Sequence, residues 1–525
     1  MLKKLIQITI LAFCLCWVIS SYAQSVNVPL SHWAYDFLNR LEIQGGFRGF
    51  HLRTLPISRQ DMAEILAQVE QSRSTNKINL SKAELDLLEQ LKGEFCEELA
   101  LLNLKSQQRY SEKHLLTWQE NNSQIKIDVD FGQRFDINRG SRYDSTSRSS
   151  FTTLGGIIRG NLKGSLGFYI HFKNTLIRGK EITSENFNPA LGLPITISGK
   201  NVYQDDASAY LIWKFPWFQF EFGRDEAKWG PGYQGSLMLS AQNPLFDMFR
   251  IRAHYKRFQF TSLHGRLSSD VGRKYLAAHR LELRISPWLF LAGSEAVVYG
   301  NRGAELQYLN PIMPYHIAEH HLGDEDNNTM GFDFTLFPAM GHKLYGELFL
   351  DDFTLSENPF HYYGNKFAFL LGYHCANPFR LKNVDLITEY TRIEPYVYTH
   401  DDLINVYKNY DRIIGHWLGP NADATFFEIR YLLNRDLKTS FMAERVRHGE
   451  GGVDIPYKEE DGTRKSFLSG IVESQWRCGF SISDQIFRDC FLNLQFHHIE
   501  TSNLNRIQGE DSSDNQVIFQ LNFNW

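Results

Sequence analysis

The last residues of the chain, NQVIFQLNFNW (515–525), carry large apolar side chains at every second position and end on Trp525. Such a period of two is typical of a β-strand whose two faces meet different surroundings. Outer-membrane β-barrels commonly end on an aromatic-terminated strand of this kind, which resembles the signal read by the barrel-insertion machinery. A soluble domain can also end on tryptophan by chance, so the remaining sequence has to decide.

The same alternation returns in QIKIDVDF (124–131), SLGFYIHF (165–172), HRLELRI (279–285) and CFLNLQF (490–496). One face of these segments is large and apolar, and the other is rich in charged groups. A soluble sandwich also alternates, but a heavily charged face opposite an apolar one is typical of a barrel with a polar lumen. The aromatic content of 14%, with 39 Phe, 24 Tyr and 10 Trp, fits aromatic girdles at the membrane interfaces.

The chain divides into three parts by composition and period. Residues 1–23 have two lysines, an apolar run and small residues before Ala23, which predicts a secretory signal peptide. Residues 24–105 are expected to form a periplasmic helical bundle, and residues 106–525 a large transmembrane antiparallel β-barrel. At roughly 10 residues per strand plus turns and loops, that length predicts about 18 strands.

Three amphipathic helices are expected before the barrel. The first lies in PLSHWAYDFLNRLEIQGG (29–46), where the paired glycines end it. The second and third follow Ser58 and Ser81, each with an acidic residue three positions later, Asp61 and Glu84. This spacing predicts a capping box, in which the serine and the acidic side chain satisfy backbone N–H groups reciprocally.

A glycine-rich segment, FEFGRDEAKWGPGYQGSLMLS (220–240), is the densest signal outside the strands. Its Arg224, Asp225, Lys228, Trp229 and Tyr233 combine charged groups with flat rings. Sugars offer hydroxyl edges for hydrogen bonds and apolar faces for stacking, so this set suits carbohydrate. A loop that folds into the lumen as a plug, with its charges paired to the wall, explains the segment equally well.

A second polar segment, YLNPIMPYHIAEHHLGDEDNN (308–328), contains Tyr315 and His316 as lumen or polysaccharide-binding candidates. Its acidic run lacks the ligand spacing of an EF-hand, and its histidines form no recognised zinc signature. A polar loop is therefore favoured over a metal site, and no metal is expected. Asp351 and Asp352 are further candidates on the polar face of a strand.

Neither a cofactor nor catalysis is expected. The sequence has no glycine-flanked nucleophilic serine and no phosphate-cradling glycine loop. The net charge of -5 gives no electrostatic footprint for nucleic acid. Two strands arranged around Asp484 would place Cys478 and Cys490 opposite each other, which predicts a cross-strand disulfide.

The chain resembles the Wzi-type capsule-assembly proteins of the bacterial outer membrane, and its opening helices resemble the branch found in Bacteroidetes-type bacteria. The residues that carry the resemblance span most of the chain: VPLSHWAYDFLNRLEIQGGF (28–47), PISRQDMAEIL (56–66), GRDEAKWGPGYQGSLMLS (223–240), YLNPIMPYH (308–316) with DNN (326–328), LYGELFLDDF (344–353) and WLGPNADA (417–424).

The resemblance implies a barrel closed by its helices on the periplasmic side. It also implies a lectin-like role in the assembly and attachment of capsular polysaccharide or exopolysaccharide at the cell surface. The expected partners are that glycan, outer-membrane lipid and, during biogenesis, the barrel-insertion machinery. A porin or substrate-selective channel is the alternative, and an outer-membrane hydrolase a weaker one.

Overall fold

The computed structural model describes most of the chain after its first 25 residues. The described residues are 26–103, 113–143, 146–179, 193–198, 201–458, 460, 462–487 and 489–524. The expected signal peptide and the terminal Trp525 lie outside them.

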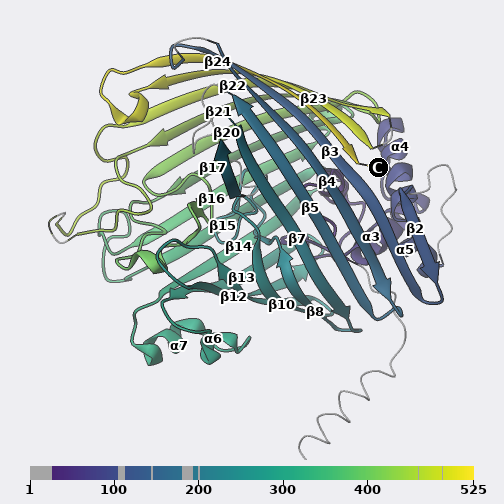
Figure 1. Cartoon of the computed structure of the whole chain (residues 1–525), viewed down its shortest axis with the longest axis horizontal. Coiled ribbons are helices and arrows are strands. Elements are labelled where there is room, and N and C mark those ends of the chain that lie inside the picture. Colours follow the sequence, from purple (N-terminus) through teal and green to yellow (C-terminus); the bar gives the residue numbers. More distant parts are fainter. Residues whose placement is uncertain are drawn as a thin grey trace, which may run out of the picture.

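Within the described residues, 18 antiparallel strands close into a barrel, as the sequence predicts (Figure 1). The last strand pairs with the first, with Phe523 opposite Phe131. In chain order, the spanning strands are β3 (Ser123–Gly140), β4 (Ser147–Leu162), β5 (Leu166–Gly179), β7 (Asn201–Lys214), β8 (Phe218–Asp225), β10 (Phe246–Tyr255), β11 (Phe258–Leu267), β12 (Lys274–Ser286), β13 (Leu289–Gly300), β14 (Asn327–Ala339), β15 (His342–Asp352), β16 (Lys366–Ala376), β17 (Val384–Ile393), β20 (Ala422–Leu432), β21 (Leu437–His448), β22 (Glu473–Phe487), β23 (Cys490–Ser502) and β24 (Ser512–Asn524).

Short strands add to this wall or lie apart from it. β2 (Leu116–Glu120) pairs with β3, and β6 (Leu193–Ser198) pairs with β7. Two further pairs lie outside the barrel sheet: β1 (Thr54–Leu55) with β9 (Lys228–Trp229), and β18 (Lys408–Asn409) with β19 (Arg412–Ile413).

The two faces of the wall follow the alternation in the sequence. Phe131, Leu281 and Phe519 are exposed on the outside, whereas Asp128 and Arg280 are buried on the inside. The period of two therefore sorts apolar groups outward and polar groups into the lumen.

Among the residues described before the wall, four form helices: α2 (Ala34–Ile43), α3 (Arg59–Ser74), α4 (Lys82–Glu94) and the short α5 (Cys96–Leu101), which adds to the three expected. Both expected capping boxes are present, with Ser58 and Asp61 at α3 and Ser81 and Glu84 at α4. No helix among the described residues is long and apolar enough to cross a membrane.

The helices lie against the barrel end where the chain turns tightly between strands. Gly341, in the β14–β15 turn, donates its N–H to the carbonyl of Ile43 at 3.0 Å. Arg40 of α2 binds Asp385 at 2.6 Å, at the start of β17. We call this the short-turn end, and the opposite one the long-loop end.

Small helices also occur between strands. α6 (Leu306–Leu309) and α7 (Tyr315–Leu322) lie between β13 and β14, and 3-10 turns occur at η4 (Pro378–Arg380), η5 (Leu403–Asn405) and η7 (Leu504–Arg506). In Figure 1, α6 and α7 project beside the wall near the loops.

The expected disulfide is wrong. Cys478 pairs with His498, Cys490 pairs with Phe487, and both thiols are free. The hairpin turns at Asp489, which has a positive φ of 62°, and Asp484 lies inside β22 opposite Leu492. The two cysteines therefore stand at different heights on the wall, too far apart to be bridged.

Candidate functional site

The glycine-rich segment after β8 runs into the lumen instead of crossing the wall again. Trp229 pairs with Thr54 in the β1–β9 sheet, and its side chain is only 1% exposed. The turn needs glycine: Gly230 has a φ of 127°, and a Cβ on Gly232 would lie 1.9 Å from the carbonyl oxygen of Gly235. We call residues 226–245 the plug loop.

Two wall carboxylates hold the backbone of the plug loop. Glu347 on β15 accepts the N–H groups of Gly232 and Leu237, at 2.8 and 2.7 Å. Glu389 on β17 accepts those of Tyr233 and Gln234, at 2.6 and 2.9 Å. Because buried N–H groups need acceptors, these carboxylates determine where the loop can lie.

A second loop, residues 394–421, enters from the long-loop end and packs on the plug loop. Tyr398 donates its hydroxyl to the carbonyl of Leu237 at 2.7 Å, and Tyr407 donates to that of Met238 at 2.9 Å. Burial lowers the pKa of His416 in this loop to about 3, so the ring is neutral at pH 7. Side chains of both loops and of the wall form one buried apolar cluster.

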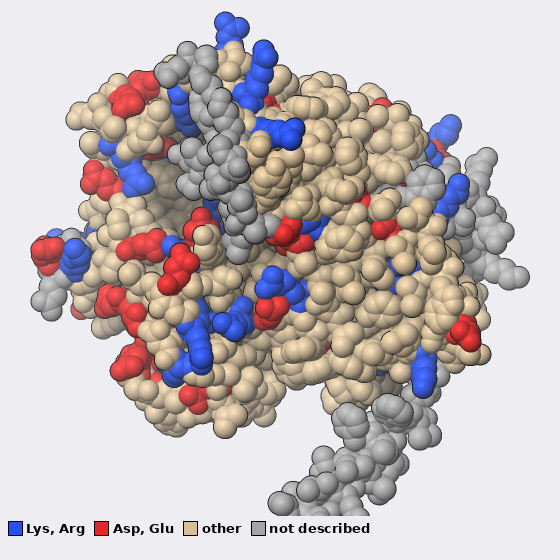
Figure 2. Space-filling view, in the orientation of Figure 1, with Lys and Arg blue, Asp and Glu red and all other residues tan. Residues whose placement is uncertain are grey.

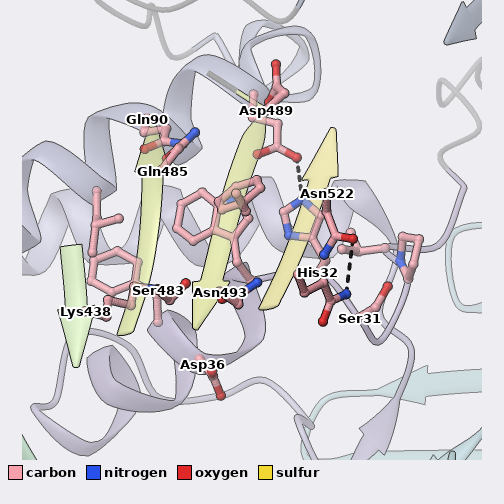
Figure 3. Close-up of a pocket in the computed structure, with 18 of the residues that line it drawn as sticks. Ser31, His32, Asp36, Gln90, Lys438, Ser483, Gln485, Asp489, Asn493 and Asn522 are labelled. Carbon is pink, nitrogen blue, oxygen red and sulfur yellow. Dashed lines mark hydrogen bonds and ion pairs between the residues drawn. The ribbon is translucent and has the colours of Figure 1, made fainter. Parts of the chain in front are cut away.

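On the other side of the lumen a chamber of about 840 Å³ remains, between the helices and strands β3–β5 and β20–β24. Figure 3 shows Gln90 of α4 beside Gln485 of β22, to which its amide donates at 3.0 Å, with Asp36 and His32 on the helical side of the chamber. The wall of β21–β24 offers neutral hydroxyl and amide groups there: Ser440, Ser481, Ser483, Asn493, Gln520 and Asn522.

A cluster of four tyrosines lies at the long-loop end. The rings of Tyr363 and Tyr457 stack with centroids 3.7 Å apart, and Tyr362 and Tyr396 contact them at 4.9 and 5.8 Å. All four side chains are partly exposed. We call them the tyrosine cluster.

The loops that carry the tyrosine cluster are locked together beneath it. Lys465 contacts Glu394 at 3.3 Å, and both side chains are fully buried. The backbone N–H of Lys465 donates to the carbonyl of His361 at 2.8 Å. Burial lowers the pKa of the Lys465 ammonium, and the nearby carboxylate of Glu394 opposes that shift. The tyrosine cluster is thus carried by three loops, β15–β16, β17–β20 and β21–β22, which are bonded to one another.

The five candidates from the glycine-rich segment separate in the structure. Arg224 forms an exposed ion pair with Asp247 at 3.0 Å, and Asp225 is buried against Arg250 at 2.6 Å. Burial lowers the pKa of Lys228, which donates to the carbonyl of Gly232. Trp229 is enclosed in the plug. The fifth, Tyr233, borders the chamber and donates its hydroxyl to Glu428 at 2.6 Å.

The remaining four candidates lie elsewhere. Tyr315 is fully buried against the outside of the wall, and His316 beside it is exposed. Asp351 accepts the N–H of Tyr398 at 2.6 Å, and Asp352 binds Lys366 at 2.8 Å. The structure therefore brings the nine candidates together at no single place. In the described part of the chain, no group of three His, Cys, Asp or Glu residues is arranged to hold a metal ion.

The tyrosine cluster escaped sequence reasoning because its members come from loops far apart in the chain. The only local signal was the adjacent pair Tyr362–Tyr363 in a loop between two apolar strands.

A closed barrel that is apolar outside and filled by its own loops defines an outer-membrane β-barrel protein. The family model described as capsule assembly protein Wzi matches residues 119–516, and the chain belongs to that family. A comparison with curated proteins found no match.

Among solved structures, one similar chain is Wzi of Escherichia coli, described as an outer-membrane protein involved in group 1 capsule assembly and as a carbohydrate-binding β-barrel. The TM-score is 0.61 at 15% identity, over 95% of this chain and 99% of that one. OccAB1 of Acinetobacter baumannii has a TM-score of 0.46 at 8% identity, over 76% of this chain and 96% of its own. OprD of Pseudomonas aeruginosa has a TM-score of 0.43 at 8% identity, over 76% of this chain and 93% of its own.

Proposed function

We propose that this protein binds capsular polysaccharide or exopolysaccharide at its long-loop end and holds it at the cell surface. Membership of the capsule-assembly family supports the role, and E. coli Wzi is described as carbohydrate-binding. Since long loops of outer-membrane barrels face the exterior, the tyrosine cluster would meet exported glycan, and residues 24–105 would lie in the periplasm.

The tyrosine cluster is the observation that carries the proposed site. Partly exposed phenol rings offer flat apolar faces to a pyranose and hydroxyls to its edges. Because the ion pair of Lys465 and Glu394 fixes the loops beneath, little ordering would be needed on binding. Binding without catalysis is the role we assign.

A channel is the competing function, and the lumen argues against it. The plug loop and residues 394–421 form a buried apolar core across half of the barrel. The helices contact the turns at the other end. We therefore expect almost no single-channel conductance in planar bilayers, whereas a porin would conduct.

The test compares two substitutions at the same positions of the cluster. In a strain that lacks the gene, Tyr363→Ala with Tyr457→Ala should reduce cell-bound capsule, because the stacking surface is lost. Tyr363→Phe with Tyr457→Phe keeps the ring faces and should retain most of it. Glycan-array binding of the purified wild-type protein and the two double variants should follow the same order.

If the alanine variant and the wild-type protein retain equal amounts of capsule at equal levels in the membrane, the tyrosine cluster is not part of the glycan-binding site. Full retention in the deletion strain itself would refute the attachment role. Clear single-channel conductance would move the assignment to a channel.

A further inference from the structure

The outer face of the wall is interrupted by a polar patch over strands β11–β14. Ser262, His279 and Glu295 stand side by side in one row, and His264 and Asn328 flank them in the next. On β12 the outward positions begin with Ile285, Leu283 and Leu281 from the short-turn end, and the next outward residue is His279. We call these five polar residues the outer polar patch.

The rows that contain this patch are apolar on either side of it. On β10, Ile251 stands opposite Ser262 and Phe249 opposite His264. On the far side, β14 continues the row with Met330, which faces Leu350 of β15. The patch therefore lies at a height where the neighbouring strands present apolar groups to the membrane.

Three apolar outward residues are too few for the membrane-facing part of β12. Each outward position adds about 5 Å of height in a strand tilted by roughly 40°, so a belt about 25 Å tall needs about five. On β3 the outward side chains Ile125, Ile127, Val129 and Phe131 are followed, after Gln133, by Phe135 and Ile137. Over β11–β14, something else has to complete the belt.

The segment with α6 and α7 folds back over the patch from the long-loop end. Glu295 accepts the first N–H groups of α7, from Tyr315 at 2.9 Å and His316 at 2.6 Å. The ring of Tyr315 lies 4.4 Å from that of His279, and Tyr308 of α6 packs on Tyr299. Ser262 and Glu295 are thereby buried, and His264, His279 and Asn328 are partly covered.

The other side of this cover is apolar and has no partner within the described structure. Leu306 and Ile312 are each 79% exposed, and Leu309 and Ile317 are exposed as well. From Gly303 to Ala318 the only Asp, Glu, Lys or Arg is Glu305. The loop between β21 and β22, in contrast, is rich in charged residues. Figure 2 shows that charged side chains in general gather on the loop side of the molecule.

We propose that residues 303–318 lie in the outer leaflet of the membrane as part of the lipid-facing surface, with Leu306, Leu309, Ile312 and Ile317 in contact with acyl chains. Leu291 and Phe332, on the two strands that the segment connects, are exposed apolar groups of the belt as well. A helical segment with an exposed apolar face can bury that face at the boundary between headgroups and acyl chains. The cover hides the polar patch and replaces it with an apolar surface.

Spin labels in phosphatidylcholine vesicles can test this placement. Ile312→Cys, Phe332→Cys and Ile455→Cys are each labelled in a background without Cys96, Cys375, Cys478 and Cys490. Phe332 faces outward on β14, and Ile455 is exposed in the charged β21–β22 loop. The Ile312 label should collide with dissolved oxygen more than with a water-soluble nickel chelate, as at Phe332, and the Ile455 label should show the reverse.

A photo-crosslinker avoids the cysteine-free background. Benzoylphenylalanine at Ile312 should form adducts with alkyne-bearing phosphatidylcholine, as it should at Phe332 but not at Ile455. The proposal is overturned if the Ile312 probe behaves as the Ile455 probe does in either experiment. It is also overturned if the Ile312 labels broaden each other or crosslink two protein chains, because the face would then be an interface between copies.

Discussion

The polar groups of the wall have different partners in the two halves of the lumen, and the two halves are filled differently. In the half formed by β8 to β17, the wall carboxyl groups of Glu347, Asp351 and Glu389 each accept backbone N–H groups from loops that enter the barrel. In the half formed by β21–β24 and β3–β5, polar groups of the wall pair with one another, as Ser440 does with Ser481 at 2.8 Å and Arg134 with Asp136 at 2.6 Å. That half contains the chamber.

The difference shows what recruits a plug. A carboxyl group whose two oxygens accept backbone N–H groups, as those of Glu347 do, fixes the position of the loop that supplies them. Wall groups that pair with their neighbours, as Ser440 does with Ser481 and Asp136 with Arg134, need no donors from an inserted loop. Three substitutions, each with a partner in the other half, would break or sharpen this comparison.

The largest effect is expected from Glu347→Leu. It leaves the N–H groups of Gly232 and Leu237 buried without an acceptor, at about 1–3 kcal/mol each, so the loss of unfolding free energy should be about 2–6 kcal/mol. Asn493→Leu on the chamber wall should change it by less than about 0.5 kcal/mol. Urea unfolding in lipid vesicles measures both, and equal losses would contradict the assigned role of the carboxylate.

Removing apolar volume from the plug should have the next largest effect. Leu237 is fully buried between the two inserted loops, so Leu237→Ala should cost about 2–5 kcal/mol. Phe491→Ala, on the chamber wall, should cost less, because one side of that ring already faces open space. The same unfolding measurement compares them. A larger loss of unfolding free energy at Phe491 would contradict the conclusion that the main apolar core lies between the two inserted loops.

Adding side-chain volume should change the unfolding free energy least. The change should be destabilising in the plugged half and neutral or stabilising in the half with the chamber. Ser236 is fully buried in the plug loop, so Ser236→Phe overpacks it and should cost about 1–3 kcal/mol. Ser483→Phe places its ring in the chamber and should be neutral or slightly stabilising. Thermal unfolding gives the order, and destabilisation of similar size at Ser483 would mean that the chamber cannot accept a side chain.

Sequence reasoning succeeded where the pattern is local. The period of two in segments such as 124–131 predicts strands whatever their partners, and the strand number follows from the length. The capping boxes at Ser58 and Ser81 are also local, because both partners lie within three residues. The plug is one of the two interpretations of the glycine-rich segment, because the glycines that shape its turns are neighbours in the sequence.

Features that depend on register or on distant loops could not be predicted. The disulfide failed because the turn lies at Asp489 instead of Asp484, which changes every cross-strand partner of Cys478 and Cys490. Nothing in the local sequence indicates that Tyr315 packs on the outside of the wall, because the groups that hold it, such as Glu295 of β13, lie outside its own segment. The tyrosine cluster combines three loops and has no local pattern.

The small β1–β9 sheet has a consequence for the order of assembly. Thr54 and Leu55 precede every spanning strand in the chain, yet they end inside the barrel, paired with Lys228 and Trp229. The barrel closes only when its last strand meets its first, β24 with β3. A barrel that closed first would have to admit this segment through its short-turn end. The wall therefore has to close around a folded interior, or its short-turn end has to stay open until the helices dock.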